Sequence, residues 1–191
     1  SYTCVIDRWG NSFSATPSDA AFGSPIVPGL GLMISSRGTQ SWIDPDHASS
    51  IAPWKRPRLT PNPAMAFKDG KLFMPFGTPG GDAQCPAMVQ TFLNIVEFGM
   101  NPQEAIESPR FVPWNFPNSF WPHAYHPGLL QLEGRISREV GRELSRRGHK
   151  IQYLDDWSPG TGAMSAIVLD HESGTLTAGA DPRRDAYAIG R

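Results

Sequence analysis

One short stretch, Phe76 to Asp82, constrains the fold of this chain more than any other. It reads Phe-Gly-Thr-Pro-Gly-Gly-Asp and lies between a strand-like run at 71–75 and a long apolar segment typical of a helix. Two glycines between a strand and a helix leave backbone N–H groups uncovered at the positive end of the helix dipole. Such a corner can bind a phosphate, a carboxylate or the oxyanion of an acyl-transfer intermediate. A tight turn that binds nothing has the same pattern.

Composition excludes several classes of protein. The 191 residues, 39% hydrophobic and 18% charged, suit one domain that buries about 70% of its unfolded surface. The net charge of −1 gives no reason to expect nucleic acid or an anionic membrane as a partner. Cys4 and Cys85 make neither a disulfide framework nor a metal cluster. No apolar run is long enough to span a membrane, so we expect no membrane span. We also expect no cofactor and no metal.

The chain begins at Ser1, without a methionine, inside a segment that we expect to be a strand. We interpret this start either as a trimmed chain or as the C-terminal product of a proteolytic cut. The second interpretation suggests that the hydroxyl of the first residue is a nucleophile and that its own α-amine, with a pKa of about 8, is the general base. The N–H groups of Gly80 and Gly81 are then the candidate donors to the oxyanion.

The apolar periodicity predicts strands and helices without a linker that divides the chain. The segment 29–35 is expected to be a short buried strand, and the helix from 84 to 100 is expected to be buried over most of its circumference. The long loop at 37–59 is expected to be functional. The order of elements suggests helices layered on stacked antiparallel sheets. The other expected strands are 1–7, 12–16, 62–67, 71–75, 150–154, 163–169 and 175–179, and the other expected helices are 101–107 and 135–147. Strands 62–67 and 71–75 are expected to form a hairpin that turns at Asp69 and Gly70, because Asp-Gly supplies the positive φ that such a turn needs.

Two further segments have competing interpretations. The stretch 111–127 is dense in aromatic residues and proline, and it contains His123 and His126. Because no third ligand accompanies these two histidines, we favour an aromatic lid over a metal site. The segment Asp181–Arg183 can be read as a site, but we interpret it as a structural tail that pairs with the body of the domain.

Several short segments, taken in order, make the chain resemble one known family over essentially its whole length. The resemblance is to the small subunit of a γ-glutamyltranspeptidase. The segments that carry it are Ser1–Asp7, Gly10–Asn11, Phe22–Val27, Lys55–Pro57, Lys68–Lys71, Gly77–Gly81, Asn94–Asn101, Ala105–Phe111 and Gly179–Arg183.

The resemblance implies an α+β fold, the four-layer αββα sandwich of the N-terminal-nucleophile hydrolases. Residues 1–191 would form the small-subunit half of one αββα domain. A precursor would cleave itself, and a separate large subunit would complete the domain as a heterodimer or a dimer of heterodimers. The family's reaction takes a small-molecule amide, forms a γ-glutamyl ester on an N-terminal threonine, and passes it to water or an amino acid. The compartment, cytoplasmic or periplasmic, stays open because a leader would lie outside this chain.

By this resemblance the family's threonine falls one place ahead of Ser1. The nucleophile is therefore either that threonine or Ser1 itself. Ser18 matches the hydroxyl that supports the nucleophile, and Gly80 and Gly81 match the oxyanion hole.

The substrate-binding positions, which we assign to Arg37, Gln40, Leu59 and Thr60, depart from the family's pattern. Gln40 stands where an acidic residue would hold the α-ammonium, and Leu59 and Thr60 stand where paired serines would hold the α-carboxylate. These replacements remove charge-assisted hydrogen bonds worth about 1.5–3 kcal/mol each. We therefore infer amide hydrolysis on a different acyl group, with oxamate-like or acylase-like amides as alternatives to γ-glutamyl amides. A non-catalytic member that binds a ligand through 113–127 is the remaining alternative.

Overall fold

The computed structural model describes residues 1–19, 21 and 23–190. Phe22, which belongs to one of the family-like segments, lies outside them. No helix in the described ranges is long and apolar enough to cross a bilayer.

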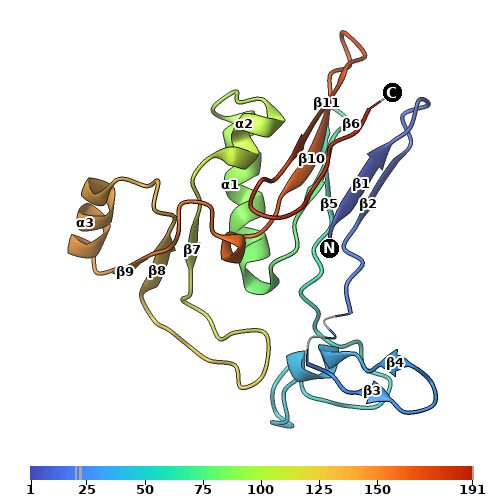
Figure 1. The fold of residues 1–191 in the computed structure, drawn as a ribbon, viewed down its shortest axis with the longest axis vertical. Coiled ribbons are helices and arrows are strands. Elements are labelled where there is room, and N and C mark those ends of the chain that lie inside the picture. Colours follow the sequence, from blue (N-terminus) through green and yellow to red (C-terminus); the bar gives the residue numbers. More distant parts are fainter. Residues whose placement is uncertain (20, 22, 191) are drawn as a thin grey trace.

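The centre of the structure is a four-stranded antiparallel sheet in the order β11-β10-β6-β5 (Figure 1). Its hairpin β5–β6 turns at Asp69 and Gly70, which have φ angles of 52° and 75°, so the predicted Asp-Gly turn is confirmed. The strands are β5 (Ala64–Lys68), β6 (Lys71–Gly77), β10 (Ser165–Leu169) and β11 (Leu176–Ala180).

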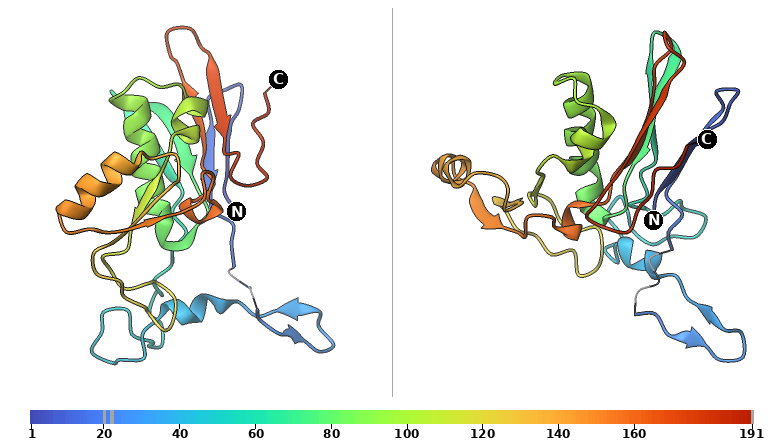
Figure 2. Two further views of the ribbon diagram at one scale, coloured as in Figure 1. Left: turned by 60° about the vertical axis from the view of Figure 1, so that its left-hand side comes forward. Right: turned by 45° about the horizontal axis from the view of Figure 1, so that its top comes forward.

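Helices cover one face of this sheet and a β-hairpin covers the other (Figure 2). The helices are α1 (Gln84–Val96) and α2 (Pro102–Glu107), and the hairpin is β1 (Thr3–Ile6) with β2 (Ser12–Ala15). The hairpin lies so close that the ring of Tyr2 occupies the position where a Cβ on Gly77 would stand. The described chain thus forms three layers, helix, sheet and hairpin.

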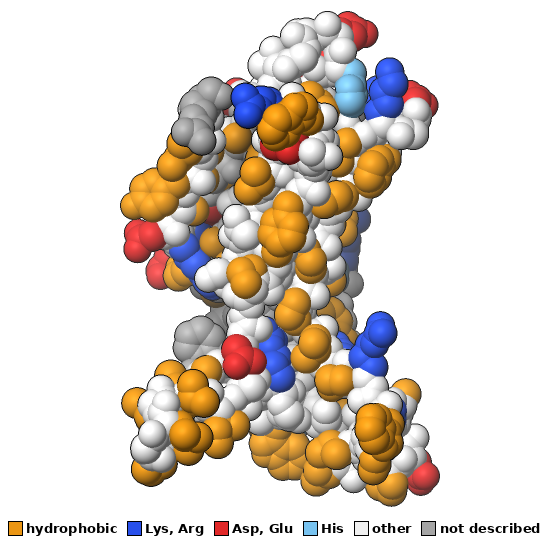
Figure 3. Space-filling model, turned by 90° about the vertical axis from the view of Figure 1, so that its right-hand side faces the viewer, with side chains coloured by type: hydrophobic (Ala, Val, Ile, Leu, Met, Phe, Trp, Pro, Cys, Tyr) orange, Lys and Arg blue, Asp and Glu red, His pale blue; other side chains and the backbone are white. Residues whose placement is uncertain are grey.

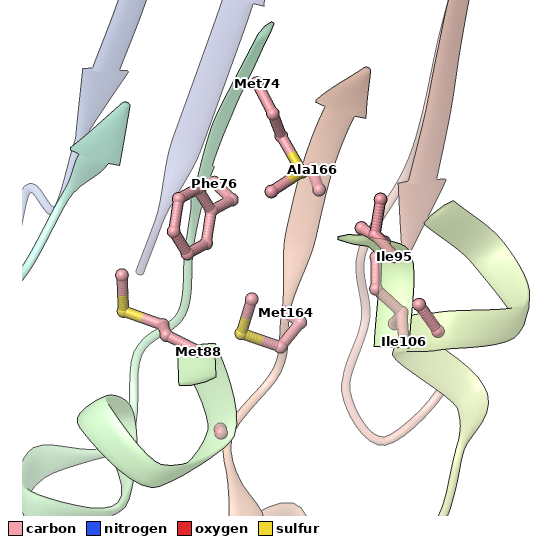
Figure 4. Close-up of a cluster of buried hydrophobic side chains, with 9 residues drawn as sticks. Met74, Phe76, Met88, Ile95, Ile106, Met164 and Ala166 are labelled. Carbon is pink, nitrogen blue, oxygen red and sulfur yellow. The ribbon is translucent and has the colours of Figure 1, made fainter. Parts of the chain in front are cut away.

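The hydrophobic core lies between the sheet and the helices (Figure 4). Apolar side chains from β6, from the segment that leads into β10, and from both helices meet there because each element presents one apolar face. The labelled members of the core are Met74, Phe76, Met88, Ile95, Ile106, Met164 and Ala166.

Two smaller units lie outside the three layers. In the first, β7 (Phe111–Pro113) pairs antiparallel with β8 (Leu129–Leu132), and β8 pairs parallel with β9 (Lys150–Tyr153) through the crossover helix α3 (Arg138–Arg146). The second unit comprises the hairpin β3 (Ile26–Val27) with β4 (Leu32–Met33) and the 3-10 turn η1 (Ser36–Gln40). Further 3-10 turns are η2 (Gly81–Ala83) and η3 (Pro159–Thr161).

Several predictions about elements were wrong. The segment 29–35 is not a buried strand: it contains the exposed β4, with Leu32 at 61% and Met33 at 49% exposure. Helix α1 ends at Val96 rather than at residue 100, with Gly99 in the left-handed region at a φ of 68°. The pairing of β8 with β9 is parallel, whereas we expected antiparallel sheets only.

The burial predicted for α1 holds on only one side of the helix. Val89, Leu93 and Val96 are 56%, 40% and 39% exposed. Val89 and Leu93 line an apolar groove together with Ala64 and Met65 of the edge strand β5.

The segment Asp181–Arg183 pairs with the body of the domain, which confirms the structural interpretation. Asp181 Oδ2 lies 2.6 Å from Arg110 Nη2, and Glu133 Oε1 lies 2.6 Å from Arg183 Nε. All four side chains are buried. Two cations and two anions therefore balance within one buried cluster.

Apolar side chains are spread over the face of the molecule that carries the β1–β2 hairpin (Figure 3). Val5 and Phe13, cross-strand partners in this hairpin, are 53% and 60% exposed. The outer face of the hairpin is thus apolar and uncovered by the rest of the described chain.

Candidate active site

A cleft at the end of β6 brings together most of the predicted site residues. It encloses about 600 Å³ and lies beside the start of the chain. Among the predicted residues, its walls include Ser1, Ser18, Arg37, Thr60, Gly80 and Gly81. The other lining residues are Thr16, Ser36, Thr39, Pro79, Gln84, Phe120, Trp121 and Arg184.

The Gly-Gly corner is fixed by Thr78, which directly follows β6. Its hydroxyl donates to the carbonyl of Pro79 at 2.6 Å and accepts the N–H of Ala163 at 2.6 Å. Gly80 has a φ of 139°, and a side chain there would lie 3.3 Å from the Cα of Gly162. The backbone angle therefore favours glycine, and a side chain would also crowd Gly162.

The N–H groups of Gly80 and Gly81 are available to a ligand. Neither donates a hydrogen bond within the part of the chain that the structure describes. Paired N–H groups beside a cleft are the geometry that binds an oxyanion.

Ser1 lines the same cleft as this corner. Burial lowers the pKa of its amine below the usual 8.0, and the positive charges of Arg184 and Arg37 lower it further. An amine with a lowered pKa is neutral, and able to accept a proton, in a larger fraction of molecules at pH 7.

Arg37 links the expected substrate-binding residues into one network. Its Nη1 donates to Gln40 Oε1 at 3.1 Å and to Thr60 Oγ1 at 2.9 Å, and its Nη2 donates to the carbonyl of Ser18 at 3.1 Å. Gln40 is fully buried beneath the arginine and donates from Nε2 to Thr60 Oγ1 at 3.2 Å. Leu59 is 48% exposed and lies outside the cleft lining.

The aromatic segment expected to form a lid reaches the cleft through Phe120 and Trp121. Asp82, directly after the Gly-Gly corner, accepts hydrogen bonds from the N–H and the hydroxyl of Ser119. The N–H of Trp121 donates to the carbonyl of Thr39 at 2.8 Å. The segment is thereby attached to both sides of the cleft.

His123 belongs to an aromatic stack. Its ring lies 4.0 Å from that of Trp42, nearly parallel, and Trp42 stacks in turn on His47. Its Nδ1 lies 2.9 Å from the carbonyl oxygen of Asn118. Residues 1–19, 21 and 23–190 contain no group of three potential ligands that could hold a metal ion.

Arg184 and Gln84 are among the cleft residues that sequence reasoning did not assign to the site. Arg184, whose Nη2 donates to the carbonyl of Pro159 at 2.7 Å, directly follows a family-like segment. Gln84 is 3% exposed, and its Oε1 has no hydrogen-bond partner among the described residues. The only available signal was the position of each residue next to a recognised segment.

The complete chain, residues 1–191, matches the sequence model of the γ-glutamyltranspeptidase family. The chain belongs to this family. A glutathione hydrolase-like YwrD proenzyme of Bacillus subtilis (strain 168) is 36% identical over 191 residues, covering 99% of this chain and 35% of the relative. An oxamate amidohydrolase proenzyme of Klebsiella pneumoniae is 35% identical over 189 residues, which cover 97% of this chain and 34% of the relative. This γ-glutamyltranspeptidase-family chain thus spans about a third of the length of the curated relatives it matches.

Two solved structures agree with the fold. The structure described as LmbA2991HD superposes with a TM-score of 0.92 at 38% identity. The match covers 100% of this chain and 34% of the LmbA2991HD chain. The T380A mutant of the Helicobacter pylori γ-glutamyltranspeptidase superposes with a TM-score of 0.77 at 25% identity. The match covers 96% of this chain and 99% of the mutant's chain. The predicted family is confirmed, together with the mixed helix and sheet of its N-terminal-nucleophile hydrolase fold.

Proposed function

We propose that this chain is the small subunit of an autoprocessed amide-bond hydrolase or acyltransferase. The acyl-enzyme forms on a hydroxyl residue at the start of β1, either Ser1 or a threonine directly ahead of it. One observation carries the proposal: Ser1 lines the same cleft as Gly80 and Gly81, whose N–H groups have no partner in the described chain.

The geometry supports a two-step acyl transfer. The neutral amine of the nucleophilic residue takes the proton from its hydroxyl, and the oxygen attacks the amide carbon. The N–H groups of Gly80 and Gly81 donate to the resulting oxyanion. Collapse expels the leaving amine, which takes up the proton, and leaves an ester. Water or an amine then attacks the ester, and the hydroxyl regains its proton.

A large subunit from the same precursor completes the αββα sandwich in this proposal. Residues 1–191 supply three layers, and the large subunit supplies the fourth. The β1–β2 hairpin supports this arrangement because its outer face carries the exposed apolar side chains of Val5 and Phe13, and exposed apolar patches often mark protein interfaces. The assembly is then a heterodimer or a dimer of heterodimers.

A non-glutamyl acyl amide is the favoured substrate. At the position expected to hold an α-ammonium, Gln40 is fully buried and bonded to Arg37 and Thr60. An amide cannot supply the negative charge that an ammonium group requires once it leaves water. The relative described as an oxamate amidohydrolase proenzyme is compatible with such a substrate.

Processing of the full precursor and the pH dependence of its activity test this proposal. Mass spectrometry should find two fragments, the smaller beginning at Ser1 or one residue earlier. With Ser1 as the nucleophile, kcat/KM should rise with pH through an apparent pKa below 8.0 and then level off, because burial and two arginines lower the pKa of the Ser1 amine. Acetylating that amine should abolish turnover. Full activity after acetylation would exclude the amine as the base, and a precursor that never cleaves would favour a non-catalytic binding protein.

A further inference from the structure

Gln84 brings a buried hydrogen-bond acceptor to the wall of the cleft. Its side chain is 3% exposed and lines the cleft together with Ser1, Gly80 and Gly81. Its Oε1 has no hydrogen-bond partner among residues 1–19, 21 and 23–190. Burial of a polar atom without a partner costs free energy, and most such atoms in folded proteins are paired. The side chain is therefore held ready for a donor that the described chain does not supply.

The start of α1 places this side chain beside the Gly-Gly corner. Gln84 follows Gly81 by three residues, and its backbone N–H donates to the carbonyl of Gly81. Residues three apart in a 3-10 turn lie on the same side of it, and helical side chains lean toward the N-terminal end of the helix. The amide group of Gln84 is therefore directed toward the corner that would hold the oxyanion.

The cleft near this corner is rich in donors and poor in acceptors. The ring of Phe120 closes one side, 3.9 Å from the place where a Cβ on Gly81 would stand. Two arginines line the wall, but no aspartate or glutamate does, and Gln84 supplies the one amide group among the described lining side chains. The buried hydroxyl of Thr16 also lacks a partner there, but a hydroxyl can donate as well as accept. Gln84 Oε1 can only accept.

We propose, on the basis of the amide-cleaving function above, that Gln84 Oε1 accepts the N–H of the amide that is cleaved. The N–H of an amide substrate is a donor that needs an acceptor once it leaves water. The amide nitrogen is bonded to the same carbon as the oxyanion, so a group beside the corner can reach it. The terminal torsion of a glutamine side chain has a broad range, which lets Oε1 turn into the cleft. Gln84 then contacts the leaving group and favours amides over esters.

Amide and ester pairs that share an acyl group test this role on the complete processed protein. The pairs are N-methyloxamate with monomethyl oxalate, and γ-glutamyl methylamide with the γ-methyl ester of glutamate; only the amides carry the N–H. We expect Gln84→Met, which has a similar shape but no acceptor, to lower kcat/KM for the amide relative to the ester by about tenfold, the factor of one hydrogen bond. Gln84→Glu keeps an acceptor and should leave this ratio close to its wild-type value.

The ratio distinguishes a contact with the leaving group from a general disturbance of the corner, which would slow amide and ester alike. An unchanged ratio in Gln84→Met would overturn the proposal and leave the amide-cleaving function intact. A ratio that falls as far in Gln84→Glu as in Gln84→Met would also overturn it, because the N–H of the Gln84 amide, and not its oxygen, would then be responsible.

Gln90, on the same helix, is the matched control. Its Oε1 accepts the N–H of Phe111 at 3.0 Å, and its Nε2 donates to the carbonyl of Phe111 at 2.9 Å. Gln90→Met should therefore lower the midpoint of thermal unfolding and leave the ratio unchanged. Gln84→Met removes an unpaired carbonyl and should raise the midpoint by about 2 °C. A lower midpoint in Gln84→Met would show that Oε1 has a partner within the complete protein, and the proposal would be wrong.

Binding separates the role of Gln84 from the proposed function. If none of the four compounds is hydrolysed, the amide-cleaving function is wrong, and calorimetry then decides about the acceptor. The wild-type protein should bind an amide about tenfold more tightly than the matching ester, and Gln84→Met should bind the two equally. Equal binding of amide and ester by the wild-type protein would show that Gln84 accepts from neither amide.

Discussion

At the scale of single residues, stability depends on a buried cluster of four charged side chains, Arg110, Glu133, Asp181 and Arg183. Asp181 accepts from Arg110 Nη2, from Arg183 Nη1 and from the N–H of Met164. Each of these bonds satisfies a group that has left water, so the loss of one anion leaves cations uncompensated. The cluster also holds the segment that ends in Arg184, and therefore one wall of the cleft.

We expect Asp181→Asn to lower the free energy of unfolding by about 3–5 kcal/mol, the usual cost of breaking a buried ion pair. Glu143→Gln is the matched control, since Glu143 pairs with Arg146 and Arg147 on the exposed surface of α3. That change should cost less than about 1 kcal/mol. Urea denaturation of the complete protein measures both, and equal costs would show that the buried cluster contributes no more than a surface pair.

At the scale of elements, the corner after β6 depends on the loop between η3 and β10. Gly162 has a φ of 96° and a ψ of −177°, a region that only glycine adopts readily. A Cβ there would lie 2.7 Å from Thr78 Oγ1, the atom that accepts the N–H of Ala163. The shape of the proposed oxyanion site thus depends on a glycine far from it in sequence.

Gly162→Ala should therefore destabilise the protein by about 1–3 kcal/mol from backbone strain, with a further cost from displacing Thr78. Gly174→Ala is the comparison, because Gly174 also has a positive φ, 71°, but nothing lies within 4 Å of a Cβ built on it. Gly174→Ala should lower the free energy of unfolding by about 1–2 kcal/mol, the cost of a left-handed backbone angle without any clash. Thermal unfolding of both variants measures the difference, and kcat/KM should fall only for Gly162→Ala.

At the scale of the whole molecule, large apolar surfaces remain open. The exposed side chains of β1–β2 and the outer side of α1 flank the central sheet, and such surface is unusual on a protein that acts alone. The chain spans about a third of the length of the curated relatives it matches. In the proposed heterodimer the large subunit covers the hairpin.

Val5→Lys in the full precursor should therefore weaken association of the two subunits by about tenfold or more, because a charge would be buried without a partner. Val140→Lys is the control: Val140 has a similar exposure, 47% against 53% for Val5, and its helix α3 lies far from the hairpin (Figure 1). Analytical ultracentrifugation across a dilution series measures the dissociation constants. An unaffected Val5→Lys complex would place the interface elsewhere.

Local sequence determined the features that depend on neighbouring residues. The Asp-Gly turn of β5–β6, the Gly-Gly corner and the family were predicted because backbone angles and short segments are encoded within a few residues. The tertiary structure alone decided that Arg184 and Gln84 join Ser1 at one cleft, since those contacts join segments far apart in the chain. It also decided that Leu32, Met33 and one side of α1 are exposed. An apolar pattern specifies which face avoids water, and only the arrangement of elements specifies what covers it.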